Sequence, residues 1–278
     1  MNAVARFYTG PGQLVAGITA ALDAAGLDRA TLRTTDLAPL DEFHIRGRAA
    51  SLEIAEALDL STDSHVLDLG SGLGGPARTL AEVSGCQVTG VDITPEFCEV
   101  ASLLSQWTGL SDRTHFQVGD ATATGLPDAT MDAAFTVHVA MNIPDKPALY
   151  AEAFRVLKPG GRFVVYDVLQ GEGGPVRYPV PWAEDPSTSF LATPDETGDM
   201  LSAAGFDAIR AVDSSDEGLT WFQQVRARIE SEGPPPITFA AFLGDSFGTM
   251  AANQVANLAE RRIRTVMFSC ERPRTPRV

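Results

Sequence analysis

Short apolar runs rich in β-branched residues alternate with helix-length segments along most of this chain. From about residue 65 onward, five such runs are separated by segments long enough for helices, and two more follow towards the C-terminus. This alternation is typical of βαβ units, whose strands form a parallel sheet with helices on both faces. We therefore expect seven strands, at residues 65–69, 86–92, 114–118, 131–137, 161–169, 207–212 and 263–271.

Three regions depart from this alternation, and we expect them to form a helical lid over one end of the sheet. Residues 1–60 precede the first strand and contain two helical patterns, near 11–25 and 47–59. A Gly- and Pro-rich segment at 170–192 follows the fifth strand, and residues 213–262 separate the last two strands. The expected lid therefore combines an N-terminal segment with two later insertions.

The composition is that of an ordinary soluble globular protein. The 278 residues are 44% hydrophobic and 21% charged, and their net charge is −15. A negative field of this size repels phosphate backbones, so we expect no nucleic-acid partner. No apolar stretch approaches the roughly 20 residues of a membrane span, and the N-terminal residues lack the apolar run of a signal peptide. We therefore expect a cytoplasmic monomer or homodimer without a membrane partner.

A Gly-rich stretch, VLDLGSGLGG at 66–75, follows the first strand and opens a helix. Ligands of an open α/β sheet bind beyond the carboxyl ends of its strands, and the first strand-to-helix loop is the usual place. Gly70, Gly72 and Gly75 match the dinucleotide fingerprint G-x-G-x-x-G, whereas Gly70, Gly72 and Gly74 spell G-x-G-x-G. The glycine count alone leaves the ligand open.

Three acidic residues at successive strand ends separate the two interpretations. Asp68 lies inside the end of the first strand, where its carboxylate would repel a pyrophosphate but would attract a cationic ligand. Asp92 ends the second strand and can accept hydrogen bonds from the ribose of either ligand. Asp120 follows the third strand and can accept one from an adenine amino group. Together they favour a cationic adenosyl ligand.

These motifs resemble the class I S-adenosylmethionine (SAM)-dependent methyltransferases. The resemblance lies in VLDLGSGLGG, VTGVD, VGDA and LKPGGRF. It implies an α/β, Rossmann-like sheet of seven mostly parallel strands with an antiparallel last strand, in a SAM-binding domain over residues 61–278 with a helical lid. The cofactor-binding residues that it implies are Asp68, Gly70, Ser71, Gly72, Gly74, Asp92, Ile93, Asp120, Ala121 and Val137.

A second resemblance is to small-molecule methyltransferases related to the sarcosine/dimethylglycine, phosphoethanolamine and tocopherol enzymes. It is carried by FYTGPGQL at 7–14, LAPLDEFHIRGRAAS at 37–51 and PVPWAEDPSTSFL at 179–191. It implies methyl transfer to nitrogen, carbon or oxygen of a metabolite or natural product, in secondary metabolism. The sarcosine-like and tocopherol-like members often have acidic or hydroxyl-rich residues after the fourth strand, where this chain has HVAMN at 138–142.

Two histidines and a tyrosine are the candidate catalytic residues. Methyl transfer requires a positioned acceptor, exclusion of water and, for a protonated nucleophile, a base. His138 follows the fourth strand, where the acceptor should lie, and His44 precedes the core domain. Each is either a base or substrate contact, or a packed histidine with a backbone partner. Tyr8 either closes over SAM or packs in the lid.

Three further residues are candidate substrate contacts. Asn142 lies one turn after His138 and could orient an acceptor, or it is a turn residue. Trp182, in a Pro-rich loop, would form an apolar pocket wall. Arg46 carries a guanidinium that suits a carboxylate of SAM or of the acceptor, or it faces solvent. No His or Cys cluster has metal-ligand spacing, so we expect no metal site.

Three other functions remain open from the sequence. A protein of this fold could bind SAM and catalyse a cyclisation or rearrangement, in which the sulfonium has only a structural or electrostatic role. It could also be a SAM-binding module without catalysis. The dinucleotide fingerprint predicts instead a nicotinamide dehydrogenase, for which Asp68 is unfavourably placed.

Overall fold

The seven apolar runs form the strands of one sheet, in the order β3-β2-β1-β4-β5-β7-β6. The computed structural model describes residues 14–235, 237–238 and 246–274. Strands from β3 to β5 pair in parallel, and β7 is antiparallel to both β5 and β6. The predicted fold class is therefore confirmed. The strands are β1 His65–Leu69, β2 Gln87–Asp92, β3 Thr114–Val118, β4 Met131–Val137, β5 Leu157–Gln170, β6 Asp207–Asp213 and β7 Ile263–Glu271.

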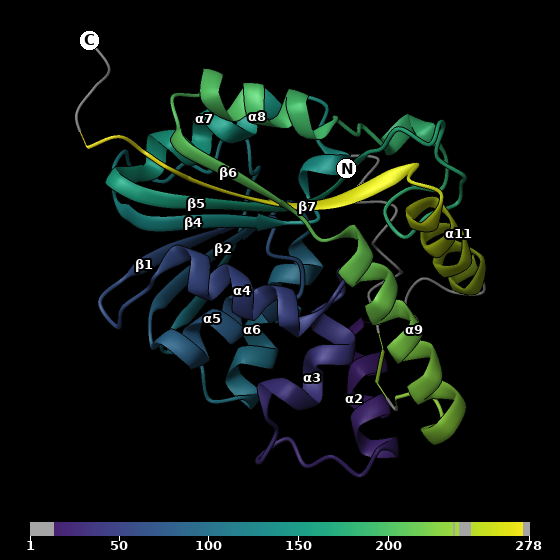
Figure 1. Cartoon of the computed structure of the whole chain (residues 1–278). Helices are drawn as coiled ribbons and strands as arrows, with labels where there is room; N and C mark the ends of the chain where they lie inside the picture. Colours follow the sequence, from purple (N-terminus) through teal and green to yellow (C-terminus); the bar gives the residue numbers. More distant parts are fainter. Residues whose placement is uncertain (1–13, 236, 239–245, 275–278) are drawn as a thin grey trace.

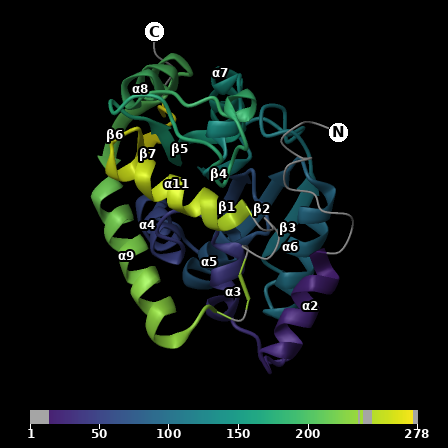
Figure 2. The ribbon, with the colours of Figure 1, turned by 90° about the vertical axis from the view of Figure 1, so that its right-hand side faces the viewer.

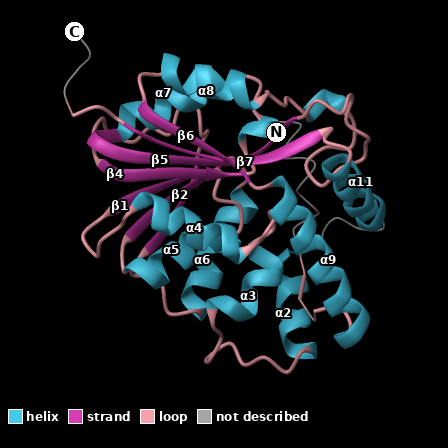
Figure 3. Cartoon of the chain, in the orientation of Figure 1, coloured by secondary structure: helices cyan, strands magenta, loops and turns pink. Residues whose placement is uncertain are grey.

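Helices cover both faces of the sheet (Figures 1 and 3). α4, α5 and α6 lie on one face and α7 and α8 on the other, whereas α9 and α11 stand beside one end of the sheet. Figure 2 shows α11 crossing in front of the sheet at that end. The helices are α2 Leu14–Ala24, α3 Thr34–Asp41, α4 Arg48–Leu58, α5 Gly75–Ser84, α6 Pro95–Trp107, α7 Lys146–Val156, α8 Pro194–Ala203, α9 Ser215–Glu232 and α11 Phe247–Ala259, with short 3-10 turns η1 Ala140–Asn142 and η2 Pro186–Thr188.

The side-chain alternation of β1 shows how the sheet is buried on both faces. Val66 packs into the apolar cluster formed with α4 and α5, whereas Leu67 and Leu69 pack into the cluster formed with α7 and α8. Successive side chains of a strand point to opposite faces, so a strand between two helical layers needs apolar residues at nearly every position. The exception in β1 is Asp68, which is buried among them.

The N-terminal region differs from the predicted lid. α4 packs on the face of the sheet in the same apolar cluster as α5, so it belongs to the core layer and not to a lid over residues 1–60. α2 and α3 pack with α6 in a separate cluster. The sequence patterns near 11–25 and 47–59 correspond to α2 and α4, whereas α3 was not expected because Pro39 lies inside it.

The strand order changes direction between β1 and β4. From β1 the chain adds β2 and β3 towards one edge of the sheet, and from β4 it adds strands towards the other edge. At such a switch point the loops after the two strands diverge and leave a crevice at their carboxyl ends. The Gly-rich loop follows β1, and His138 follows β4. No helix in the described part of the chain is long and apolar enough to cross a membrane.

Candidate active site

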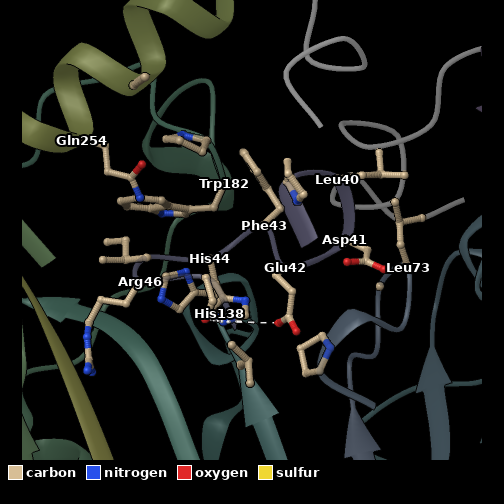
Figure 4. A pocket seen from close by; sticks show the side chains of 18 of the residues that line it. Leu40, Asp41, Glu42, Phe43, His44, Arg46, Leu73, His138, Trp182 and Gln254 are labelled. Atoms are coloured by element: carbon tan, nitrogen blue, oxygen red, sulfur yellow. Dashed lines mark hydrogen bonds and ion pairs between the residues drawn. The ribbon is translucent and has the colours of Figure 1, made fainter. Parts of the chain in front are cut away.

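A cavity of about 1820 Å³ lies beyond the carboxyl ends of β1, β2 and β4. Pockets for one small ligand usually measure roughly 300–1,000 Å³, so this cavity has room for two. We call the part lined by residues 70–73, 91–94 and 120–122 the loop end. We call the part lined by Trp182, α9 and α11 the helix end. His44 and His138 line the cavity as well, and Figure 4 shows them below Trp182.

Backbone hydrogen bonds fix the Gly-rich loop to the end of β2. The backbone N–H groups of Gly70 and Ser71 both donate to the carbonyl oxygen of Val91, at 2.8 and 3.1 Å. The backbone N–H of Gly72 donates to Asp92 Oδ2 at 2.8 Å, and that of Thr94 donates to Asp92 Oδ1 at 2.8 Å. Asp92 therefore sets the shape of this loop, and each of its oxygens retains a lone pair for a further donor.

Two buried polar atoms at the loop end lack a hydrogen-bond partner among the described residues. They are Asp68 Oδ2 and Ser71 Oγ. The Asp68 side chain belongs to a residue that is only 2% exposed. Burial, and then the nearby charge of Asp92, raise the pKa of Asp68 well above its usual value. Because buried polar groups normally have partners, these two atoms indicate a ligand that supplies a cationic hydrogen-bond donor.

The glycines of the loop differ in what a larger residue at each position would meet. A Cβ on Gly70 would lie 2.4 Å from Val139 Cγ2, and one on Gly74 would lie 2.5 Å from the Phe116 ring. A Cβ on Gly75 would lie 2.2 Å from the carbonyl oxygen of Asp41. Only Gly72 has open space around its Cβ direction. The third glycine of either sequence motif is thus required by close packing, of Gly74 against β3 and of Gly75 against α3, and it does not discriminate between ligands.

The remaining predicted cofactor residues also border the cavity. Asp120 is exposed, and its Oδ1 accepts from the backbone N–H and the hydroxyl of Thr122, at 2.8 and 2.7 Å. Asp120 thereby forms a tight turn and leaves Oδ2 available. Ile93, Ala121 and Val137 line the cavity from the ends of β2, β3 and β4.

His138 adopts a left-handed backbone conformation directly after β4, with φ 53°. Its backbone N–H donates to the carbonyl oxygen of Tyr166 at 2.8 Å, and its ring lies 5.2 Å from the Tyr166 ring between centroids. The Nε2 atom is buried without a partner among the described residues. Burial, and then the neighbouring His44, lower the pKa of His138 well below its usual value, so the ring is neutral at pH 7.

His44 is a second buried neutral histidine, with its ring 5.8 Å from that of His138 between centroids. Its Nε2 lies 2.9 Å from the carbonyl oxygen of Gly47, to which it donates in the matching tautomer. Burial lowers the pKa of His44 to about 4, although the bond to Gly47 opposes this. His44 thus has the backbone partner expected of a packed histidine and also faces the cavity (Figure 4).

The three predicted substrate residues are engaged within the protein. The Asn142 amide nitrogen donates to the backbone oxygens of Trp182 and Thr188, at 2.9 and 2.8 Å, so it ties the 170–192 segment to η1. The buried Trp182 donates from Nε1 to the Ser189 hydroxyl at 3.0 Å and presents its ring to the cavity. The Arg46 guanidinium forms a two-pronged ion pair with Glu53. Tyr8 lies outside the described residues.

A buried acidic pair beside the loop end was not among the sequence candidates. Asp41 Oδ2 pairs with the fully buried Arg78 at 2.7 Å. Glu42 accepts from the hydroxyls of Ser51, at 2.6 Å, and of Thr79. Burial raises the pKa of Asp41 to about 6 and raises that of Glu42. The available signal was the acidic pair inside the otherwise apolar stretch LAPLDEFHI, but its partner Arg78 is distant in sequence.

The described residues contain no group of three or more His, Cys, Asp or Glu side chains arranged to bind a metal ion.

The fold and the loops at the switch point together define a class of protein. A seven-stranded sheet with β7 inserted antiparallel between β5 and β6, and acidic residues at the ends of β1 and β2, is the Rossmann-like methyltransferase architecture. Residues 67–165 match the family described as "Methyltransferase domain". Residues 67–165 are therefore similar to a methyltransferase domain, and they lie within a sheet of the Rossmann-like methyltransferase fold.

Relatives of known activity differ in what they methylate. The phosphoethanolamine N-methyltransferase of Triticum aestivum is 31% identical over 184 residues, which are 66% of this chain and 36% of that protein. The sterol 4-C-methyltransferase of Caenorhabditis elegans is 38% identical over 117 residues, 42% of this chain and 35% of that protein. The chain thus spans little more than a third of the length of these relatives.

Two solved structures resemble almost the whole chain in fold. The phosphoethanolamine N-methyltransferase 2 of Haemonchus contortus, in complex with phosphomonomethylethanolamine and S-adenosylhomocysteine, superposes with a TM-score of 0.75 at 20% identity. The superposed part includes 98% of this chain and 61% of the Haemonchus contortus chain. The [4+2]-cyclase SpnF has a TM-score of 0.64 at 23% identity and covers 94% of both chains. The same fold therefore accompanies both methyl transfer and cyclisation.

Proposed function

We propose that this chain transfers the methyl group of SAM to nitrogen, carbon or oxygen of a small-molecule acceptor. The observation that carries the proposal is the pair of unpartnered buried atoms, Asp68 Oδ2 and Ser71 Oγ, in the first loop of a methyltransferase domain. A buried carboxylate in this place is costly unless a cation meets it, and the ammonium group of SAM is such a cation.

The described loop end fits SAM residue by residue. Asp68 and Ser71 would bind its ammonium and carboxylate part, and the open space at Gly72 admits the ligand close to the backbone. Asp92 has free lone pairs for the ribose hydroxyls. The free oxygen of Asp120 would accept from the adenine amino group, while Ile93, Ala121 and Val137 enclose the adenosyl part as apolar neighbours.

His138 is the best candidate for a general base. SAM supplies an electrophilic methyl group on a positive sulfur. The acceptor's electron pair forms the new bond to that methyl carbon, the carbon–sulfur bond breaks towards sulfur, and any proton of the acceptor must be removed. The neutral His138 ring can accept this proton at Nε2, which faces no other partner among the described residues. The Nε2 atom is itself buried, which limits the access of water to it.

Substitution of His138 tests this role. We expect His138→Ala to lower kcat by about 10²–10⁴-fold, the usual size of general-base catalysis, while the affinity for S-adenosylhomocysteine (SAH) stays unchanged. The exposed His115 at the start of β3 offers the matched control His115→Ala. An unchanged kcat in His138→Ala would leave His138 a packing residue, and His44 would then be the base to test. Tyr8 would contact SAM or the acceptor and is tested in the same way.

The activity itself is tested with SAM that carries a trideuterated methyl group. Incubation with a panel of amines, phenols, sterols and isoprenoids should release SAH together with a product heavier by the labelled methyl group. Calorimetry should show binding of SAH and none of NAD. Binding of NAD without SAH would contradict the proposal, and binding of SAH without product across the panel would indicate a non-catalytic SAM-binding module.

A second candidate is a SAM-binding cyclase. The observation that favours it is the extent of the fold shared with the cyclase SpnF, which includes nearly all of both chains. Such an enzyme would convert its substrate without release of SAH, so the labelled-methyl experiment distinguishes the two. We further propose that the protein is cytoplasmic and acts in secondary metabolism. We also propose that it is a monomer or homodimer, and gel filtration would test this oligomeric state.

A further inference from the structure

The helix end of the cavity has apolar walls. Its side chains come from the segment at Trp182 and from two helices that lie far apart from the loop end in sequence. Trp182 is buried, and Figure 4 shows its ring between Gln254 and His44. Since the whole cavity measures about 1820 Å³ and a pocket for one small ligand roughly 300–1,000 Å³, SAM in the loop end would leave space for a second ligand. The apolar wall residues are Phe43, Trp182, Leu219, Phe222, Val225 and Val255.

The cationic side chains around this cavity are either paired with a carboxylate or exposed to solvent. Arg46 pairs with Glu53, and Arg48 pairs with Glu82. Arg226 of α9 pairs with Glu230, and its side chain is 81% exposed. Arg228, also on α9, is exposed. The described lining thus offers no buried unpaired cation, and a phosphate placed in the helix end would lose its hydration without compensation.

The same end offers no buried anion to a cationic ligand. The carboxylates of α9 that border the cavity, Glu230 and Glu232, are exposed. The two histidines at the junction with the loop end are neutral because burial lowers the pKa of each. Ionised amines in protein sites normally need a carboxylate or a set of aromatic faces. The aromatic faces of Phe43, Trp182 and Phe222 offer a cation only a weak attraction compared with the hydration it would lose, so the described walls suit a group without charge best.

One buried amide, that of Gln254, interrupts the apolar wall. Gln254 lies on α11, is 8% exposed and lines the cavity. Figure 4 shows its amide directed towards the ring of Trp182 and not out of the cavity. Within the part of the chain that the structure describes, no hydrogen bond involves this amide. An amide offers both a donor and an acceptor without charge, which suits a hydroxyl or carbonyl oxygen.

We propose that the acceptor is a large, uncharged and mostly apolar molecule, one of whose hydroxyl or carbonyl oxygens is bound by Gln254. This inference rests on the proposed methyl transfer, because it assigns the helix end to the acceptor. It selects among the acceptor chemistries of the relatives: a polycyclic or isoprenoid skeleton fits these walls, and a phosphate-bearing headgroup does not. Gln254 is then a specificity residue in the helix end of the cavity, away from SAM.

The charge preference is tested with ligands that share one skeleton. The SAH-saturated full chain is titrated with the uncharged dye Nile red, whose emission shifts to the blue in an apolar site. Farnesol, farnesyl diphosphate and farnesylamine then compete for the dye. We expect farnesol to displace it at a concentration at least about tenfold lower than either charged analogue requires, a difference of about 1.4 kcal/mol. Equal or stronger displacement by a charged analogue would overturn the proposal.

Two pairs of variants locate the binding. Ala251→Trp fills the chamber and should weaken Nile red binding at least tenfold, whereas Ala259→Trp, on the exposed end of the same helix, should leave it unchanged. Gln254→Leu should abolish the preference for farnesol over the hydrocarbon farnesene. Gln106→Leu, at an exposed position of α6, should preserve that preference. An unchanged preference in Gln254→Leu would remove Gln254 from the site.

Calorimetry with SAH, on the same samples, separates this inference from the proposed function. If SAH binds but the dye does not, or if the charged analogues bind best, the acceptor assignment is wrong and the methyl-transfer proposal stands. If SAH does not bind, the proposed function itself is wrong. Unchanged SAH affinity in each variant also shows that the variant has folded.

Discussion

The loop end and the helix end of the cavity differ in charge and in the kind of chain that forms them. At the loop end, the ends of the neighbouring strands β1 and β2 bring the carboxylates of Asp68 and Asp92 together with several backbone N–H groups of the following loops. At the helix end, α9 and α11 contribute apolar side chains, exposed polar side chains from the second half of α9 and a single buried amide, Gln254, among the described residues. One end is polar and fixed, and the other is apolar and spacious.

This difference shows why one ligand can be recognised from the sequence and the other cannot. A charged ligand needs charged partners at defined positions, and in a parallel sheet those positions follow the ends of successive strands, which the sequence pattern locates. An apolar ligand needs volume and shape, which amphipathic helices of many sequences provide. The sequences of α9 and α11 therefore specify helices with an apolar face and little about what that face binds.

The largest expected effect is a difference in the free energy of unfolding between substitutions at two glycines of the Gly-rich loop. Gly70→Ala should lower the free energy of unfolding by about 2–4 kcal/mol, because φ is 83° and the new Cβ would lie 2.4 Å from Val139. Gly72→Ala has open space and should cost only about 1 kcal/mol from its positive φ. Urea unfolding of the two variants measures the difference. Equal losses of stability would contradict the separate roles of these glycines.

Acid should destabilise the histidine pair between the two ends. The folded-state pKa of His44 is about 4, so between pH 6.5 and 4 the unfolded chain binds more protons at this residue and stability is lost as the pH falls. The contribution is about 3 kcal/mol, from about 1.4 kcal/mol per pH unit. Buried carboxylates with raised pKa values act in the opposite direction, so the comparison is with His44→Gln, measured by urea unfolding at pH 7 and 4.5.

The matched control for this experiment is His65→Gln, at an exposed position. We expect its pH dependence to equal that of the wild type. If His44→Gln loses as much stability as the wild type between pH 7 and 4.5, His44 is not the neutral buried histidine described above.

Asp68 should strengthen SAH binding and lower the stability of the ligand-free protein. Asp68→Asn should weaken SAH binding by about 1–3 kcal/mol through the loss of a charge-assisted hydrogen bond. Without ligand, the same variant should be more stable at pH 7, because burial raises the pKa of Asp68 and ionisation in the folded state is unfavourable. Calorimetry and urea unfolding measure the two effects, with the exposed Asp112→Asn as control. Loss of stability with unchanged SAH affinity would make Asp68 structural.

The smallest expected effect concerns the attachment of the 170–192 segment. Asn142→Ala removes two hydrogen bonds to backbone oxygens, of Trp182 and Thr188, and should lower the free energy of unfolding by about 1–2 kcal/mol. SAH affinity should change by less than about twofold, because Asn142 supports the helix end. A large loss of SAH affinity, measured by calorimetry, would show that the two ends are not independent.

The sequence predicted the sheet and the polar loop end, because both follow from local patterns. Each strand was placed to within a few residues, and the largest difference is in β5, which begins at Leu157 and not at 161 because the KPGG backbone is part of the strand. The assignment of α4 to a lid was wrong, because an amphipathic pattern shows that one face of a helix is packed but does not show which element it packs against. The ion pair of Asp41 with Arg78 and the place of Gln254 depend on contacts between distant segments, which no local pattern specifies.

A crystal structure of the chain with SAH tests the central claim most directly. The account predicts that the amino nitrogen of SAH lies about 3 Å from Asp68 Oδ2, that the ribose hydroxyls face Asp92, and that the volume between Trp182, α9 and α11 stays free for the acceptor. An SAH molecule whose amino group lies away from Asp68, or whose adenosyl part occupies the helix end, would contradict it.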